Sequence, residues 1–321
     1  MFRPAPAVGY ELRPAFHGTG ANGEDILVDS RGLRDGGPAS HADGRPRVLA
    51  LGDSFVFGLG VEAADAFPAA LERALHGRDR VENGGVPGYN LLQNVARLEE
   101  ALPALAPAVV VLGFLENDIH NVDTPDFEAT PDGRLGRHPK AYLPETNVNS
   151  FQALGGPWLW LQLHSAAFRL ASYAMIRSRL HITGDEELAA LARASEQSSS
   201  LGDRLLRGEL DAETEPRFAA ADRLLGRAAA SARAAGTRLV LVLFPRPEQL
   251  VSERLRGGSA RITAAARRVG IEVVDPTPAL AGEPDRIGLY LFPNDHHPSA
   301  RGHAAVAAEV ARRWPAVAPD M

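Results

Sequence analysis

The run Val48-Leu49-Ala50-Leu51-Gly52-Asp53-Ser54 decides the fold class of this chain. Four consecutive apolar residues indicate a strand that is buried on both faces, and the Gly-Asp-Ser that follows is typical of a sharp turn. The next segment, residues 67–75, has helical spacing, with Pro68 in its first turn and Gly77 just after its end. A buried strand followed by a helix is the repeating unit of a parallel α/β sheet.

The same pattern recurs on both sides of a long region that fits it poorly. Further strands are expected at residues 80–82, 108–112, 238–244 and 271–274, and helices at residues 91–102, 260–269 and 299–313. Because the expected strands are apolar throughout, they predict a central parallel sheet with helices on both faces, a three-layer α/β/α architecture.

This rhythm divides the 321 residues into a core and two additions. Residues 47–118 and 236–314 carry the strands and together have the length of one ordinary domain, roughly 150 residues. Residues 1–46, rich in Gly, Pro and Asp, are interpreted as an irregular N-terminal arm that could include a hairpin. Residues 119–235 are interpreted as an insertion between the third and fourth core strands, loop-like at first and largely helical afterwards.

Composition excludes several classes of protein. The formal net charge is −6 and no Lys/Arg-rich block occurs, which argues against a nucleic-acid surface. Because cysteine is absent, disulfides, thiolate catalysis and Cys-ligated zinc are excluded. Residues 157–176 are the most apolar stretch, but they include Arg169 and are interpreted as an amphipathic helix rather than a membrane span. Residues 1–14 lack the apolar segment of a secretion signal, so the sequence as written predicts a cytoplasmic location.

Polar residues suited to chemistry follow the ends of the predicted strands. Ser54 comes after the first strand, Gly88 lies in the loop after the second, and Asn117 lies in the loop after the third. Asp295 and His297 stand just before the last helix. In parallel α/β sheets such loops meet at one edge, where ligands bind. A hydroxyl, an imidazole with a carboxylate, and amide donors are the parts needed for acyl transfer through an oxyanion.

Each of these signals also has an ordinary structural interpretation. Gly-Asp-Ser is most often a turn or a helix N-cap, and Asn-Asp after a strand is usually an Asx turn. His296, His297 and His303 together could suggest a metal, but they lack carboxylate partners at the spacing of a catalytic zinc site, so no metal is expected. The order and placement of all the motifs together favour catalysis.

Taken together, the motifs resemble those of the SGNH, or GDSL-like, hydrolase superfamily. Leu51-Gly52-Asp53-Ser54-Phe55 is similar to its first block, residues 83–89 to the second, Asn117-Asp118 to the third, and the Asp/His run before the last helix to the fourth. The resemblance implies a flavodoxin-like sheet, Ser54 as nucleophile, and an Asp–His pair near the C-terminus. It further implies an oxyanion hole made by Ser54, Gly88 and Asn117.

The fourth block departs from the family pattern. The family often has Asp three residues before the catalytic His, whereas Asn294 stands three residues before His297. Asp295 then has to supply the carboxylate. His296 is the competing base, but His297 is favoured because Pro298 follows it, as in the family.

Three residues are candidates for substrate binding. Glu116 replaces the glycine that usually precedes the third-block Asn and is a candidate specificity residue. Arg246, between two prolines after the fourth strand, faces the same sheet edge and is a candidate ligand for an anionic group, although a solvated loop residue is the simpler interpretation. His296, if it is not the base, is the third candidate.

The resulting hypothesis is a serine esterase that hydrolyses a short acyl ester, acetyl first, of a carbohydrate or another small molecule. It would form an acyl-enzyme and need no cofactor. Three alternatives stay open: an acyltransferase in which a hydroxyl replaces water, a lipase-like or thioesterase activity on longer chains, and a non-catalytic binding module that retains the motifs.

Overall fold

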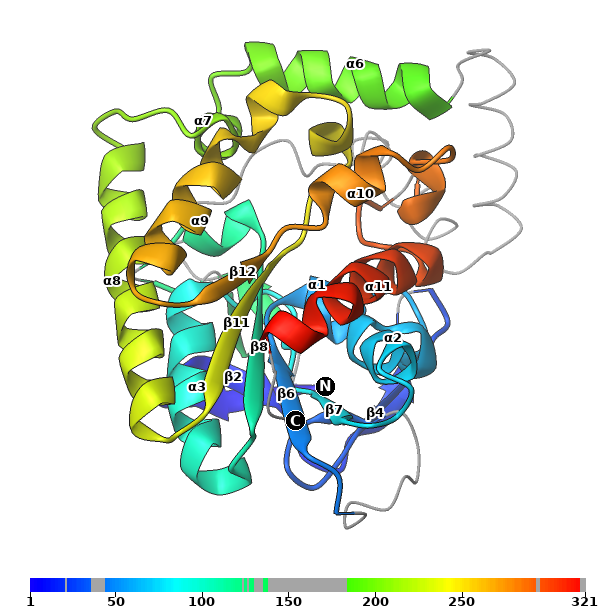
Figure 1. Cartoon of the computed structure of the whole chain (residues 1–321), viewed down its shortest axis with the longest axis vertical. Coiled ribbons are helices and arrows are strands. Elements are labelled where there is room, and N and C mark those ends of the chain that lie inside the picture. Colours follow the sequence, from blue (N-terminus) through cyan, green and yellow to red (C-terminus); the bar gives the residue numbers. More distant parts are fainter. Residues whose placement is uncertain are drawn as a thin grey trace.

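The computed structural model describes residues 1–20, 22–35, 44–122, 124–125, 127–129, 135–137, 184–292 and 295–317. An eight-stranded sheet runs through the described chain in the order β12-β11-β8-β6-β7-β5-β4-β3 (Figure 1). Its core strands are β6 (Arg47–Leu51), β7 (Arg80–Asn83), β8 (Val109–Phe114), β11 (Arg238–Leu243) and β12 (Glu272–Val274). These five strands are parallel to one another. Their ends differ from the predicted ones by only a few residues.

Helices cover both faces of the sheet, which confirms the expected three-layer α/β/α fold. One face carries α3 (Leu91–Leu105), α8 (Thr214–Ala234) and α9 (Gly257–Arg268), and the other carries α2 (Phe67–Ala74) and α11 (Ala300–Val317). Leu49 and Leu51 belong to the buried cluster beneath α3 and α8, whereas Val48 and Ala50 belong to the cluster beneath α2 and α11. Because strand side chains alternate between faces, a strand covered on both sides must be apolar throughout.

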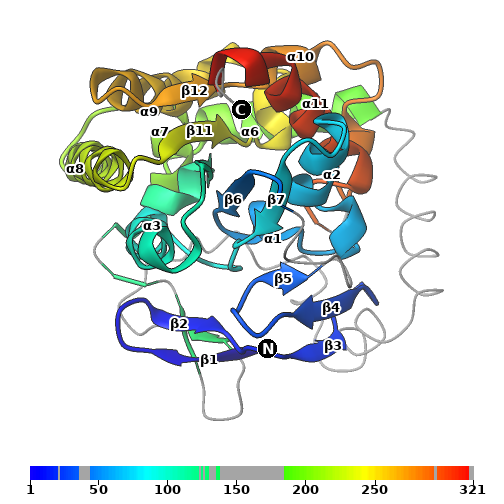
Figure 2. The same ribbon diagram turned by 60° about the horizontal axis from the view of Figure 1, so that its bottom comes forward.

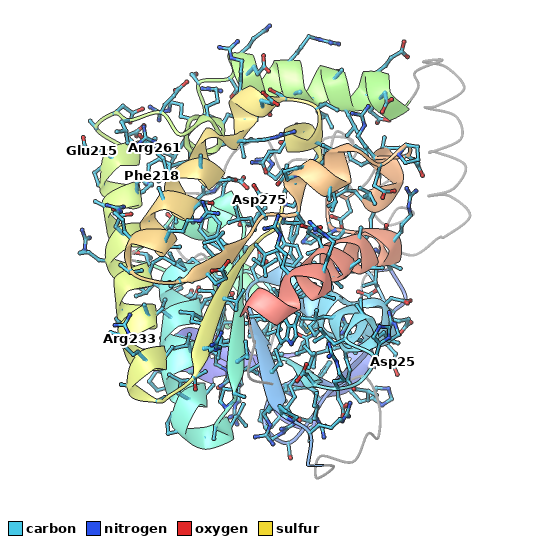
Figure 3. All side chains as sticks on the ribbon, in the orientation of Figure 1. Asp25, Glu215, Phe218, Arg233, Arg261 and Asp275 are labelled. Carbon is cyan, nitrogen blue, oxygen red and sulfur yellow. The ribbon has the colours of Figure 1, made fainter. Side chains whose placement is uncertain are left out.

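Side chains fill the space between these layers (Figure 3). At the outer edge of the helical layer, the Arg261 guanidinium of α9 lies over the Phe218 ring of α8, 5.7 Å from its centroid, and both are labelled in Figure 3. The helices of the layer are therefore packed against one another as well as against the sheet.

The N-terminal arm is more regular than the sequence indicated. Its first strands, β1 (Phe2–Ala5) and β2 (Gly9–Leu12), form an antiparallel hairpin. The next three, β3 (His17–Thr19), β4 (Asp25–Val28) and β5 (Arg34–Asp35), extend the sheet beyond β7 with antiparallel pairing, so the whole sheet is mixed. Figure 2 shows the arm along one side of the core. Only Ile26 and Val28 of β4 are buried, and so short an alternation gives a weak sequence signal.

The described part of the 119–235 segment is mostly helical. Its elements are β9 (Phe127–Ala129), β10 (Leu135–Arg137), α6 (Gly184–Gln197), α7 (Leu201–Arg207) and α8. Helix α8 packs beside α3 and α9, while α6 and α7 pack on short helices that follow β11 and β8, at the carboxyl edge of the sheet (Figure 1). None of the described helices is long and apolar enough to cross a membrane. The stretch 157–176 lies outside the described residues.

Among the described residues, further short helices complete the loops at this edge and before α11. They are η1 (Ala63–Asp65), η2 (Glu116–Ile119), η5 (Pro247–Leu250), η6 (Glu253–Arg256) and η7 (Ile287–Leu289), and α10 (Thr277–Ala281) follows β12. The loops that carry the predicted site residues thus lie next to short, hydrogen-bonded helices.

Candidate active site

Ser54 is the first residue of a four-residue helix, α1 (Ser54–Phe57), that begins directly after β6. Asp53 caps this helix, because its side chain accepts a hydrogen bond of 2.9 Å from the Phe55 backbone N–H. Burial raises the pKa of Asp53, although the bond from Phe55 and the charge of His297 act in the opposite direction. The cap fixes the turn that holds the Ser54 hydroxyl at the carboxyl edge of the sheet.

A chain of hydrogen bonds joins Ser54, His297 and Asp295. The Ser54 Oγ lies 2.7 Å from His297 Nε2, and His297 Nδ1 lies 2.5 Å from Asp295 Oδ1. A carboxylate can only accept, so Nδ1 carries the hydrogen and Nε2 of the neutral ring accepts from the serine hydroxyl. Burial alone would raise the pKa of Asp295, but its hydrogen bonds with His297 lower it overall, so the carboxylate stays ionised.

The backbone around His297 holds the imidazole against the turn that carries Ser54. The Asp295 carboxylate also accepts a bond of 3.0 Å from the His297 N–H, and the His297 carbonyl accepts one of 2.9 Å from Leu291. The Phe55 ring of α1 packs on the imidazole, with the ring centroids 5.0 Å apart. Helix α11 begins three residues later. These contacts fix the ring in the orientation that reaches Ser54.

The loop that carries Gly88 is bound to the same turn. The Val86 N–H donates to the Gly52 carbonyl at 2.9 Å. Gly88 has φ +79°, and a Cβ there would lie 2.7 Å from Phe127 Cδ2, so only glycine fits this position without strain. Within the described residues, neither the Ser54 N–H nor the Gly88 N–H donates to another protein group. Both N–H groups are therefore available to a ligand.

Asn117 lies in η2, directly after β8, and reaches the nucleophile turn. Its Nδ2 is 3.5 Å from Asp53 Oδ2. The turn after β8 is stabilised by Asp118, whose side chain accepts a hydrogen bond of 3.0 Å from the Leu115 N–H. The side-chain amide of Asn117 thus lies next to Asp53, the residue that precedes Ser54.

The three predicted substrate-binding residues have partners other than Ser54, His297 and Asp295. Arg246 pairs with Glu116 at 2.8 Å and also with Glu248, so its charge is already engaged by two carboxylates. His296 makes no contact with Ser54; its ring stacks on Phe292, with the centroids 4.7 Å apart and the planes 26° apart. Burial lowers the pKa of His296, and the charge of Arg246 adds to this effect. His297, and not its neighbour, bonds to the serine.

No group of three or more His, Asp or Glu side chains that could hold a metal ion occurs in the part of the chain that the structure describes. His303, the third histidine of the C-terminal cluster, is buried in α11. Burial lowers its pKa to about 3, so its imidazole is neutral. Asn294 lies outside the described residues.

The proton-transfer chain lies at the surface. The side chain of His297 is 22% exposed and that of Asp295 is 32% exposed. Two cavities, of about 550 and 560 Å³, lie elsewhere: one beside β5, β7 and α2, the other at the start of β11 and β12. Neither is lined by a residue of the Ser54–His297–Asp295 chain.

Sequence reasoning missed several residues that support the site. The Tyr10 hydroxyl of β2 donates to the Pro87 carbonyl at 2.9 Å, next to Gly88, and the Tyr89 hydroxyl donates to the Tyr10 carbonyl at 2.6 Å. Glu248 was also overlooked. Its signal was present, since a carboxylate in a loop after a core strand is a candidate for the shared sheet edge. Tyr10 gave no such signal, because its partners are 77 and 79 residues away.

Comparisons with known proteins give one family match. The model of the GDSL-like Lipase/Acylhydrolase family matches residues 50–305. Among curated proteins no match was found. Similar solved structures include TesA, with 17% identity, a TM-score of 0.46, and coverage of 85% of this chain and 98% of that one. A lipase/acylhydrolase from Enterococcus faecalis has 12% identity, a TM-score of 0.44 and coverage of 84% and 96%. The SGNH-hydrolase family esterase AlinE4 has 20% identity, a TM-score of 0.39 and coverage of 86% and 97%.

Proposed function

The chain belongs to the GDSL-like lipase/acylhydrolase family and is an ester-hydrolysing enzyme, and from this premise we propose that it is a serine esterase. The acyl group that it removes is short, with acetyl as the first candidate. The acyl group is attached to a hydroxyl of a carbohydrate or another small molecule. The observation that carries the proposal is the continuous hydrogen-bond chain from Ser54 Oγ through His297 to Asp295. A serine hydroxyl becomes a good nucleophile only when such a base removes its proton.

The first half of the reaction forms an acyl-enzyme. Ser54 Oγ attacks the ester carbonyl while His297 Nε2 takes its proton, and Asp295 stabilises the imidazolium. The negative oxygen of the tetrahedral intermediate accepts hydrogen bonds from the Ser54 N–H, the Gly88 N–H and the Asn117 amide. The intermediate collapses, the bond to the alcohol oxygen breaks, and His297 gives its proton to the leaving alcohol.

Water completes the cycle. His297 takes a proton from a water molecule as the water oxygen attacks the acyl carbonyl, and the same three donors hold the second tetrahedral intermediate. When the bond to Ser54 Oγ breaks, the proton returns to the serine and the carboxylic acid leaves. No residue outside the predicted set is required for any of these proton transfers.

The length of the acyl group can be tested directly. For an esterase that removes short acyl groups, a panel of p-nitrophenyl esters from acetate to octanoate should show the highest kcat/KM at the short end. A maximum at octanoate would favour the lipase-like alternative.

The nucleophile can be tested directly. A fluorophosphonate probe should label the protein once, and peptide mapping should locate the label on Ser54. Ser54→Ala should abolish hydrolysis of p-nitrophenyl acetate and leave the unfolding temperature nearly unchanged. Ser231→Ala, at a serine that bonds to Glu99 on the outer face of α8, is the matched control and should keep full activity. Hydrolysis at the wild-type rate by Ser54→Ala would refute the proposal.

A further inference from the structure

A cluster of three charged residues lies beside the oxyanion donors and takes no part in the proton transfers. Glu116 directly precedes Asn117 in η2, Arg246 follows β11, and Glu248 lies in η5. Arg246 donates to Glu116 Oε1 at 2.8 Å and to Glu248 Oε1. The two carboxylates are 7% and 1% exposed. We call these three residues the acidic cluster.

Each carboxylate of the acidic cluster uses only one of its two oxygens. The second oxygens, Glu116 Oε2 and Glu248 Oε2, are buried and accept no hydrogen bond within the described chain. Burying a charged oxygen without a hydrogen-bond donor costs free energy of folding, and such oxygens are rare in native proteins. Two such oxygens around a single guanidinium are therefore suited to receive donors from a ligand.

Neighbouring elements support the backbone that carries the cluster. The Arg246 N–H donates to Gln249 Oε1 at 2.8 Å, and Gln249 Nε2 donates to the Leu255 carbonyl at 2.9 Å. Helix α6 packs on η5 and α7 packs on η2, so both carboxylates sit on elements supported from outside. Acceptors held in place before binding lose little entropy when a ligand arrives.

The charge of the acidic cluster determines which class of ligand can donate hydrogen bonds to it. Two carboxylates around one guanidinium give the cluster a formal net negative charge. The net negative charge disfavours the anionic ligand that the sequence allowed for Arg246. A cationic ligand would lie next to a guanidinium, whereas a neutral hydroxyl donates to the carboxylates without that repulsion.

The acidic cluster adjoins the reacting atoms. Glu116 directly precedes Asn117, whose Nδ2 lies 3.5 Å from Oδ2 of Asp53, the cap of the helix that begins at Ser54. Arg246 joins Glu116 to Glu248. The cluster is therefore connected through Asn117 to the turn that carries Ser54.

We propose that Glu116 and Glu248 form a subsite that accepts hydrogen bonds from free hydroxyl groups in the alcohol part of the ester, so that polyhydroxylated alcohols such as sugars are the preferred leaving groups. This inference rests on the proposed esterase function. It assigns a role to the oxygens that the protein leaves unpartnered, and it makes Arg246 the residue that orients both carboxylates.

A matched pair of substrates tests the subsite. Methyl 6-O-acetyl-glucopyranoside offers three free hydroxyls, and cyclohexylmethyl acetate has a ring of the same size with none. The ratio of their kcat/KM values does not depend on the fraction of folded enzyme. In the wild type the ratio should favour the sugar ester on the order of 10- to 100-fold, as expected for one or two hydrogen bonds to charged acceptors.

Isosteric variants locate the effect. Glu116→Gln and Glu248→Gln should each lower the ratio by about 10-fold, mainly through KM, because an amide oxygen accepts more weakly than a carboxylate. Glu99→Gln is the control, since Glu99 pairs with Arg227 on the outer surface of α3 and α8 and should leave the ratio unchanged. Unfolding temperatures establish that all three variants are folded.

The outcomes separate this inference from the proposed function. If the wild type hydrolyses both esters equally well, or if the ratio survives both Gln substitutions, the subsite is refuted and the esterase proposal stands. If acetylcholine is preferred over the sugar ester and that preference disappears in the variants, the ligand is a cation and the hydroxyl proposal is wrong. If neither ester is hydrolysed and the fluorophosphonate leaves Ser54 unlabelled, the proposed function itself fails.

Discussion

Arg34 of β5 holds the helix that carries the nucleophile, and its removal should be felt in both stability and activity. The side chain is buried, and its guanidinium donates to the carbonyls of Phe57, Gly58 and Val61 at 2.7, 2.6 and 2.8 Å. Phe57 ends α1 and Gly58 caps it, so an arm residue fixes the far end of the helix that begins at Ser54. The perturbation is Arg34→Met, which keeps the apolar stem and removes every donor.

The magnitude follows from which carbonyls lose their donor. Phe57 O keeps a bond of 3.0 Å from Asn83 Nδ2, whereas Gly58 O keeps only a bond of 3.3 Å from the Val61 N–H and Val61 O is left without a donor among the described residues. A buried group without its partner costs about 1–3 kcal/mol. The variant also avoids the desolvation of a buried cation, the effect that lowers the pKa of Arg34. A net loss of about 2–4 kcal/mol in the free energy of unfolding is expected.

Urea unfolding followed by circular dichroism measures this loss, and p-nitrophenyl acetate measures activity. Because a small displacement of a catalytic group lowers the rate strongly, kcat should fall about 10- to 100-fold in Arg34→Met. Arg34→Lys should be intermediate, since one ammonium cannot serve three carbonyls in the geometry of the guanidinium. Arg227→Met, at an exposed pair with Glu99, is the control and should cost less than about 0.5 kcal/mol. Equal unfolding midpoints and equal kcat in Arg34→Met and the control would refute the reasoning.

Three further substitutions probe the site. Asn117→Ala removes one oxyanion donor and should lower kcat by about 10²- to 10³-fold with little change in KM, whereas a loss confined to KM would assign the amide to ground-state binding. Gly88→Ala places a Cβ at φ +79°, 2.7 Å from the Phe127 ring, and should lower both kcat and the free energy of unfolding, the latter by about 1–3 kcal/mol; an unchanged midpoint in urea would contradict this. Asp295→Asn removes a carboxylate whose pKa in the folded protein lies below the ordinary value of 3.8. The carboxylate therefore stabilises the folded protein above pH 3.8, and this stabilisation is lost as the pH falls through the folded-state pKa. The stability gap between wild type and Asp295→Asn, from urea titrations at several pH values, should therefore close on acidification, and a gap that widens in acid would be inconsistent with the His297 bond.

The core could be predicted because its signals are local. Val48, Leu49, Ala50 and Leu51 are all buried. Because a strand covered on both faces has no polar positions, its continuous apolar run is easy to recognise in the sequence. The arm strands were harder, since β5 is only two residues long and β4 has one buried face. Their pairing with β7 joins Arg34 to Asn83, a contact that neither stretch signals by its composition.

The acidic cluster shows the limit of sequence reasoning at the site. The sequence predicts Glu116 as a candidate specificity residue and Arg246 as a candidate ligand for an anionic group. Their direct bond spans 130 residues and places a carboxylate against the guanidinium of Arg246. Glu248 completes the cluster and was not singled out at all. Charge at a single position can be read from the sequence, whereas the net charge of a site depends on which residues meet there.

The sequence by itself determined the layers of the fold and the chemical parts at the strand ends, because burial on two faces and the turn after a strand are properties of neighbouring residues. Tertiary structure alone decided which parts touch. His296 and His297 are adjacent in the chain, yet one stacks on Phe292 and the other bonds to Ser54 across 243 residues. Which of the two histidines reaches Ser54 depends on how the loop after η7 returns to the sheet. A contact between segments so distant in the sequence produces no local sequence pattern.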